Sequence, residues 1–221
     1  MELGQRLAAP EVLSQAFNTL GVSLARRGEL EEGVAKVEQS LQLALQHDHL
    51  AAACRAYTNL GMLLAAVDQE RALAYCHEGL TLAKKIGDLS QQSWLYASVA
   101  SSFCSLVGDC SQGIEAAEAS VALDQQLGQR NHLPIPLILL AQIHQCQDQL
   151  EESERYYLEA CAIAEEIGEP QQLFPCYDGL ATLYLARGDT VKAEAYLAKG
   201  LEICQKTGYS PDTLIMLPFL C

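Results

Sequence analysis

The stretch Tyr57-Thr58-Asn59-Leu60-Gly61 decides the fold, because it ends in an apolar residue followed directly by a small one. This pair recurs at a constant step along the chain, at Leu20-Gly21, Leu60-Gly61, Ala100-Ser101, Leu140-Ala141 and Leu180-Ala181. A fixed period of this order is the signature of a repeat protein, in which each unit is one supersecondary element that packs on its neighbours. The sequence therefore predicts five repeat units over residues 10–209, each of about 40 residues.

Each unit also carries a turn signal and two further small residues. Seven residues after the small residue stands a Gly or Asp, types that end one helix or open the next: Gly28, Asp68, Gly108, Asp148 and Gly188. Small residues, which let two antiparallel helices approach closely, then follow at Gly33, Ala72, Gly113, Ser153 and Ala193, and at Ser40, Gly79, Ser120, Ala160 and Gly200. The step from Gly33 to Ala72 is one residue short of the full period, which predicts that the turn within the second unit is one residue shorter than the turn within the first.

The composition favours an all-α protein. Half of the residues are hydrophobic and only 6% are aromatic, with Ala and Leu prominent, which suits closely packed helices better than a sheet rich in Val, Ile and Thr. Together with the repeat, this predicts a series of antiparallel helical hairpins.

These residues resemble the tetratricopeptide repeat, most clearly in Tyr57 to Gly61 and in Tyr177 to Tyr184 with Ala193. The usual unit has about 34 residues and a closing proline; here the unit is longer, at about 40, and lacks that proline, so the helices, especially the second of each pair, should be longer. The variant is similar to the long-helix repeats of G-protein-signalling modulator adaptors, kinesin light chains and bacterial TPR regulators. The resemblance implies a right-handed superhelical solenoid of helical hairpins. HEAT and armadillo repeats have a similar period but would not be expected to place small residues at these contacts.

The two ends of the chain fall outside the five units. Residues 1–9 are interpreted as a leader or the end of a preceding unit. Residues 210–221 continue the ladder, with Cys221 in the small-residue position one full period after Ala181, and are interpreted as the first helix of a partial sixth repeat or as a C-terminal cap. We expect the chain to be a fragment of a larger regulatory protein, because the ends of solenoids normally carry a polar outer face.

Charge and cysteine content narrow the functional classes. A net charge of −14 argues against nucleic acid and against an anionic membrane surface, since both need clustered Lys and Arg. No apolar run approaches the roughly 20 residues of a membrane span, and no signal peptide begins the chain. The nine cysteines are scattered through apolar positions without a CxxC pair, which favours reduced, buried thiols. The sequence predicts a cytoplasmic protein without a metal or cofactor.

The resemblance implies that the first helix of each unit lines an inner, concave surface. Taken as residues 10–27, 50–67, 90–107, 131–147 and 171–187, these helices carry four basic and two acidic residues, so that their net charge is +2 and the rest of the chain carries −16. A nearly neutral, polar groove suits an extended peptide whose backbone needs donors and acceptors. The candidate contacts are Gln15, Asn18, Arg26, Arg55, Thr58, Asn59, Met62, Ser98, Ser102, Gln142, Gln145, Asp178 and Thr182.

Three of these candidates carry a specific hypothesis. Asn59, directly before Leu60-Gly61, resembles the position with which related adaptors grip a ligand backbone; the alternative is that it bonds within its own hairpin. Arg55 is expected to pair with a carboxylate on the ligand and Arg26 to reinforce it, since a guanidinium offers a bidentate fork. The alternative is that each arginine forms an ion pair with a nearby glutamate of the same chain.

No catalytic arrangement emerges. His47-Asp48-His49 lacks a third ligand in local spacing and is interpreted as a solvated turn, as are His77 and His132. His144 occupies a packing position, and Trp94 is interpreted as a packing residue. The sequence therefore predicts a non-enzymatic scaffold or adaptor that binds a partner peptide or helix. The alternatives are a structural spacer that self-associates through exposed repeat ends, and a sensor of a signal peptide or small ligand.

Overall fold

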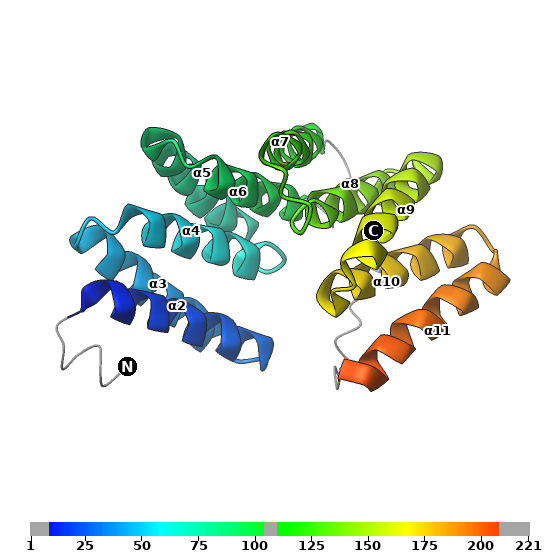
Figure 1. The fold of residues 1–221 in the computed structure, drawn as a ribbon, viewed down its shortest axis with the longest axis horizontal. Helices are drawn as coiled ribbons and strands as arrows, with labels where there is room; N and C mark the ends of the chain where they lie inside the picture. Colours follow the sequence, from blue (N-terminus) through cyan, green and yellow to red (C-terminus); the bar gives the residue numbers. More distant parts are fainter. Residues whose placement is uncertain (1–8, 104–109, 208–221) are drawn as a thin grey trace. The chain divides into compact units, whose positions relative to one another are not determined.

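The computed structural model describes residues 9–103 and 110–207, and every regular element in these ranges is an α-helix (Figure 1). The chain divides into two compact units, unit 1 (Met1–Ser102) and unit 2 (Phe103–Cys221). Unit 1 contains α2 (Pro10–Arg26), α3 (Leu30–Gln46), α4 (Leu50–Leu64), α5 (Gln69–Ile86) and α6 (Leu89–Ser101). Unit 2 contains α7 (Ser111–Leu127), α8 (Pro134–Cys146), α9 (Leu150–Ile167), α10 (Pro170–Ala186) and α11 (Thr190–Thr207). The all-α prediction is confirmed.

Consecutive helices pack as hairpins: α2 with α3 and α4 with α5 in unit 1, and α8 with α9 and α10 with α11 in unit 2. Three of the connections contain a residue in the left-handed backbone conformation: Gly28 (φ 88°), Asp148 (φ 60°) and Gly188 (φ 76°). This conformation favours Gly and is tolerated by Asp. Asp68 acts differently: its side chain accepts a hydrogen bond from the Arg71 backbone and caps α5. These four turn predictions are confirmed.

Two of the small residues, Gly21 and Gly33, stand where the backbones of α2 and α3 nearly touch. A Cβ atom on Gly21 would lie 2.5 Å from the carbonyl oxygen of Gly33, and one on Gly33 would lie 2.6 Å from that of Gly21. Gly21 and Gly33 therefore mark the contact between α2 and α3, whereas a Cβ on Gly200, another of the predicted small residues, would meet no described atom within 4 Å. In the next hairpin, α5 begins at Gln69, one residue short of a full period after the start of α3. The connection between α4 and α5, residues 65–68, is nevertheless longer than the one between α2 and α3, residues 27–29, so the prediction of a shorter turn was wrong.

Two predicted first helices have the wrong bounds. The helix expected at residues 90–107 ends at Ser101, so α6 has 13 residues, and α6 and α7, expected as the third hairpin, belong to different units. The helix expected from residue 131 begins at Pro134, because the proline ring suits the first turn of a helix. Gly108, the leader over residues 1–8 and the partial sixth repeat at residues 210–221 lie outside the described residues.

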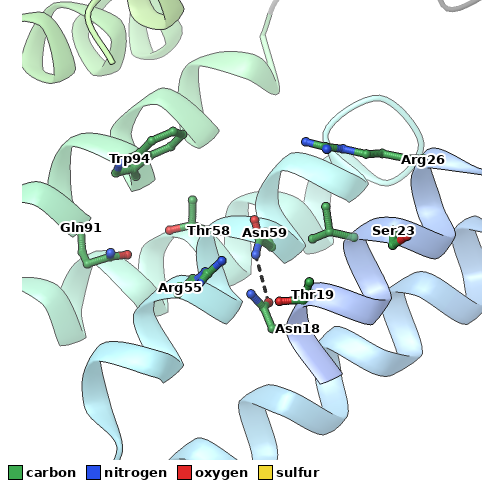
Figure 2. A pocket seen from close by; sticks show the side chains of 10 residues that line it. Asn18, Thr19, Ser23, Arg26, Arg55, Thr58, Asn59, Gln91 and Trp94 are labelled. Atoms are coloured by element: carbon green, nitrogen blue, oxygen red, sulfur yellow. Dashed lines mark hydrogen bonds between the residues drawn. The ribbon is translucent and has the colours of Figure 1, made fainter. Parts of the chain in front are cut away.

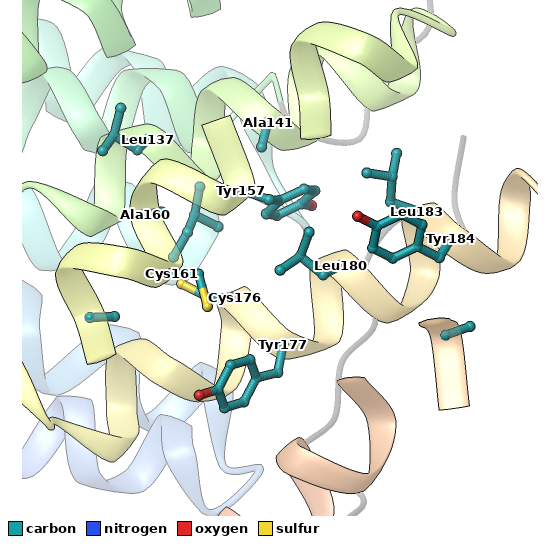
Figure 3. Close-up of a cluster of buried hydrophobic side chains, with 13 residues drawn as sticks. Leu137, Ala141, Tyr157, Ala160, Cys161, Cys176, Tyr177, Leu180, Leu183 and Tyr184 are labelled. Carbon is teal, nitrogen blue, oxygen red and sulfur yellow. The ribbon is translucent and has the colours of Figure 1, made fainter. Parts of the chain in front are cut away.

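The core of unit 2 is built from large side chains beside small ones (Figure 3). Tyr157 of α9 is fully buried, and Leu180 of α10 and Ala141 of α8 belong to the same cluster. Buried, free thiols among the described residues include Cys54, Cys76, Cys161, Cys176 and Cys204. Cys146 is disulfide-bonded, so the expectation that all nine thiols are reduced was wrong.

The interpretation of His132 as a solvated turn residue was also wrong. His132 is 4% exposed, and its Nδ1 lies 2.6 Å from Oδ2 of Asp124, which is 1% exposed. His77 is exposed, but on α5 rather than in a turn. His144 does pack, with its ring stacked on Tyr156 and Nδ1 2.5 Å from the Gln149 side chain. The His132–Asp124 pair is therefore part of the interior of unit 2.

Candidate functional site

Unit 1 contains a pocket of about 810 Å³ whose walls come from the first helices α2, α4 and α6 (Figure 2). The residues that line it are Asn18, Thr19, Val22, Ser23, Arg26, Arg55, Thr58, Asn59, Gln91 and Trp94. Eight of these ten side chains are polar or charged. The pocket thus differs from a typical small-molecule site, whose lining is predominantly apolar.

Helix periodicity explains why these residues meet. Residues three or four apart lie on one face of a helix, and Asn18, Val22 and Arg26 follow this spacing on α2, as do Arg55 and Asn59 on α4. Side chains hold the helices in register. The Ser98 hydroxyl on α6 donates to the backbone carbonyl of Thr58 on α4 at 3.3 Å, across 40 residues of sequence. The repeat period therefore places equivalent faces side by side.

An asparagine pair joins α2 to α4 at the pocket. Asn59 Nδ2 donates to Asn18 Oδ1 at 3.0 Å, which Figure 2 shows as a dashed line. Asn18 is 2% exposed, and its Nδ2 is buried without a hydrogen-bond partner among the described residues. The alternative that Asn59 bonds within its own hairpin is wrong, because its partner belongs to the preceding hairpin. This bond joins Asn59 Nδ2 to Asn18 Oδ1 and leaves Nδ2 of Asn18 and Oδ1 of Asn59 outside it.

Arg26 and Arg55 are exposed, and neither forms an ion pair with a described residue. Every other described arginine has a carboxylate partner: Arg27, Arg71, Arg130, Arg155 and Arg187. Acidic residues outnumber basic ones by 28 to 14 in this chain, so partners are abundant. The two unpaired guanidiniums therefore stand out, and both line the pocket.

The structure brings five of the predicted contacts together and separates the others. Asn18, Arg26, Arg55, Thr58 and Asn59 line the pocket. Gln15 and Met62 are exposed on α2 and α4 but do not line it.

Two predicted contacts on α6 are buried instead. Ser98 and Ser102 are buried, and the Ser102 hydroxyl donates to the Ser98 carbonyl. Short hydroxyl side chains on helices often bond the preceding turn in this way. These two hydroxyls are already used within the fold.

The four predicted contacts of unit 2 do not line the pocket of unit 1. Gln142 is buried, and Gln145 accepts from the Tyr157 hydroxyl at 3.3 Å. The Thr182 hydroxyl donates to the Asp178 backbone carbonyl at 2.9 Å. Asp178 is half-buried, and burial raises the pKa of its carboxyl to about 6.

Five lining residues were not among the predicted contacts. Thr19, Val22 and Ser23 lie beside or one turn from the predicted positions on α2, so the same spacing identifies them. Gln91 and Trp94 lie seven and four residues before Ser98 on α6. Trp94 is 36% exposed, so it is not simply a packing residue. Extending the helical spacing along α6 would have found both.

The pocket mainly offers hydrogen-bond donors, two guanidiniums and an unused amide among them. Such a surface suits carboxylates and peptide carbonyls. In the described ranges, no three His, Cys, Asp or Glu residues are grouped so as to hold a metal ion. No helix in those ranges is long and apolar enough to cross a membrane.

A tetratricopeptide repeat family model matches residues 132–206. Residues 132–206 are tetratricopeptide repeats. This confirms the resemblance for α8 to α11, whereas the pocket on α2, α4 and α6 lies outside the matched segment and shares only the fold.

Solved structures extend the likeness in fold to most of the chain. BtubC (BKLC) from P. vanneervenii aligns with a TM-score of 0.69 at 17% identity, over 95% of this chain and 89% of its own. Nearly identical TPR-like repeats of a putative kinesin light chain from Podosopora anserina align with a TM-score of 0.58 at 18% identity, over 91% of this chain and 99% of their own.

A signal-transduction ATPase with a tetratricopeptide repeat sensor, from Pyrococcus horikoshii, has a TM-score of 0.66 at 18% identity. It aligns over 87% of this chain, which spans only 29% of that protein. At such identities the likeness shows a shared fold alone. Among curated proteins, no sequence match was found.

Proposed function

We propose that the protein is a protein–protein interaction scaffold, and that unit 1 binds a peptide or helix of a partner along its first helices. Tetratricopeptide repeats generally mediate such interactions and are typically non-enzymatic. The chain contributes a pocket that spans three consecutive first helices, rather than a closed cavity. A segment of another protein laid across α2, α4 and α6 would contact all three.

One observation carries the proposal: the buried Nδ2 of Asn18 has no hydrogen-bond partner among the described residues. Leaving a buried donor unsatisfied costs about 1–3 kcal/mol, so native proteins rarely do so without a reason. A carbonyl oxygen from a bound segment would satisfy this donor, and Asn59 would accept a backbone N–H beside it. The cost borne by the free protein then contributes to affinity.

The proposal is tested by selecting ligands for the 221-residue chain from a displayed library of short random peptides and measuring affinity by titration calorimetry. Replacing Arg55 and Asn59 together by Ala should weaken binding by about 1–3 kcal/mol, because polar and charged hydrogen bonds are lost. Gln15→Ala and Arg27→Ala are the matched controls, since both residues are exposed on or beside α2 and neither lines the pocket. Equal affinity of the double variant and the wild type would place the site elsewhere.

We also propose a cytoplasmic adaptor, supported by the buried, free thiols, although the disulfide at Cys146 counts against a uniformly reduced state. The self-association alternative relied on exposed repeat ends, and residues 208–221 at one of these ends lie outside the described residues. Sedimentation velocity over a hundredfold range of concentration separates the two: a scaffold keeps one sedimentation coefficient, and a self-associating module does not.

A further inference from the structure

We propose that residues 211–221 form a first helix that packs on the free face of α11, over Leu197 and Leu201. The segment lies outside the described residues, whereas the surface of α11 that would receive it is described. The proposal concerns unit 2 alone, so it does not depend on the pocket of unit 1 or on a peptide ligand.

α11 exposes apolar side chains at positions that are buried on the other second helices. Leu197 lies four residues after the small residue Ala193 and is 43% exposed. The residues at the same position of α3, α5, α7 and α9 are all fully buried: Val37, Cys76, Ala117 and Tyr157. Leu201, one turn later, is 37% exposed, whereas its counterparts on three other second helices are buried: Leu41, Leu80 and Cys161. α11 therefore carries the side chains of a covered helix without a described element over them.

In each earlier hairpin, the first helix that follows covers this face. α4 packs on α3, α6 on α5, α8 on α7 and α10 on α9. On α5, a Cβ atom on Gly79, the counterpart of Gly200, would lie 2.7 Å from the Leu95 side chain of α6. On α9, Tyr157 fills the space beside Gly179 of α10, where an added Cβ would overlap the tyrosine ring. The surface of α11 is therefore that of a helix on which another first helix packs.

Residues 210–221 carry the signals of a helix start. Ser210 is a favoured N-cap residue, and Pro211 suits the first turn, as Pro170 does in α10. The interior Pro218 is compatible with a first helix of this chain, because Pro175 lies inside α10. A helix of residues 211–221 spans about 16 Å, which exceeds the single turn that separates the two exposed leucines of α11.

The segment also repeats apolar residues that α10 buries against α9. Cys176 and Leu180 of α10 are fully buried and belong to the same cluster as Tyr157 (Figure 3). One period of 40 residues later stand Met216 and Leu220, both large and apolar. A helix in the same register as α10 therefore places these two side chains over α11.

The contact between Tyr157 and Gly179 has a counterpart of complementary size. One period after Tyr157 stands Leu197, which is smaller. One period after Gly179 stands Phe219, so that the aromatic ring comes from the first helix instead of the second. Gly200, whose Cβ position has no described atom within 4 Å, leaves further room for this ring. The surface of α11 therefore fits an aromatic residue at position 219.

A first helix from a second copy fits this surface less well. Stacking of two copies end to end would place α2 of the second copy on α11, with Thr19 at the position of Phe219. Thr19 is exposed and lines the pocket of unit 1, so that its hydroxyl would face an apolar surface. Residues 211–221, by contrast, follow α11 after residues 208–210, a link as short as residues 47–49 between α3 and α4. A link of this length gives a high effective concentration, which favours the chain's own segment.

Methyl NMR of the 221-residue chain tests the contact, with protonated Leu methyl groups and Phe rings on a deuterated background. We expect nuclear Overhauser effects between the methyl groups of Leu197 and Leu201 and the ring of Phe219, and Phe219→Ala should remove them. Phe219→Asp should also speed amide exchange over residues 197–204 of α11 at least about tenfold, because the apolar cover is lost.

Val191→Asp is the matched control. Val191 is 77% exposed on α11, but it lies at the outward position that Glu31 occupies on α3 and Glu151 on α9. This substitution should leave the Overhauser effects and the exchange of residues 197–204 unchanged. Circular dichroism of each variant checks that helix content is retained.

Three results would overturn the proposal. Overhauser effects in a mixture of copies that carry only protonated Leu with copies that carry only protonated Phe would assign the contact to a second copy. Methyl groups of Leu197 and Leu201 that a soluble paramagnetic agent relaxes strongly would show that the face is open. Protection of these methyl groups without contacts to Phe219 would show that another part of the chain covers them. Each result leaves peptide binding by unit 1 untouched, because the two surfaces share no residue.

Discussion

The close approach of α2 and α3 in unit 1 gives the sharpest test of the structure. Replacing Gly21 by Ala would place a Cβ atom 2.5 Å from the Gly33 carbonyl oxygen, 2.6 Å from Val37 Cγ2 and 3.0 Å from the Val37 backbone nitrogen. Ordinary contact begins near 3.4 Å, so α2 and α3 must separate by about 0.9 Å. Two of the three atoms belong to the backbone, so no side-chain rotation relieves the contact.

The separation has a cost that can be estimated. Overpacking of this kind costs about 1–3 kcal/mol. The same seam holds two hydrogen bonds, from the Ser14 hydroxyl to the Ser40 backbone carbonyl at 3.0 Å and from the Ser40 hydroxyl to the Ser14 backbone carbonyl at 2.7 Å, and lengthening them loses about 1–2 kcal/mol more. Ala recovers about 1 kcal/mol over Gly within a helix. We expect Gly21→Ala to lower the free energy of unfolding of unit 1 by about 1–4 kcal/mol.

Urea unfolding followed by tryptophan fluorescence measures this effect. Trp94 is the single tryptophan of the chain and lies on α6, so its emission reports on unit 1. With a slope near 1 kcal/mol/M, the midpoint should fall by about 1–4 M. Gly200→Ala is the control, because its Cβ would meet no described atom within 4 Å and Gly200 lies on α11 of unit 2, so the midpoint that Trp94 reports should stay unchanged. A Gly21→Ala protein as stable as the wild type would refute the close approach of α2 and α3.

Three further predictions concern ionisable groups. The pKa of Asp178 in the folded protein is raised to about 6, so the protein loses stability as this carboxyl ionises between about pH 4 and 6. Asp178→Asn should remove this pH dependence. At pH 7 it should raise the free energy of unfolding, measured in urea, by about 1 kcal/mol after a discount for partial exposure of the side chain. Burial raises the pKa of the Cys76 thiol to about 12, so Ellman's reagent at pH 8 should label it only after unfolding. Tyr184 donates to Glu154 and lowers the pKa of that carboxyl, so Tyr184→Phe should raise this pKa in an NMR titration; an unchanged value would mean that the bond does not form in solution.

The helical hairpins could be predicted from the sequence because close packing of two helices requires small residues at the points of contact. Gly21 and Gly33 are small because each backbone occupies the space that the other's Cβ would need. The repeated small residues do not indicate where a helix ends, and the helix expected at residues 90–107 ends at Ser101. Contact positions repeat with the period, whereas helix ends depend on local caps and prolines, as at Pro134.

The interior of unit 2 held a feature that no local pattern marks. His132 and Asp124 are eight residues apart, and both are buried with Nδ1 and Oδ2 2.6 Å from each other. The chain between them passes through Gly128, which ends α7 with φ 66°. From sequence, His132 is a polar residue after a helix end, and such residues are usually exposed. Its burial follows from the tertiary fold.

Neighbouring arginines show why the candidate site could be predicted only in part. Arg26 and Arg27 are adjacent and carry the same side chain and charge, yet Arg27 pairs with Glu29 at 3.2 Å while Arg26 lines the pocket. Successive residues near a helix end point about 100° apart, so one residue of difference changes the surroundings entirely. Charge alone therefore identifies both arginines as candidates. Which charge the protein leaves unsatisfied is decided by rotation about the helix and by the partners that packing brings near.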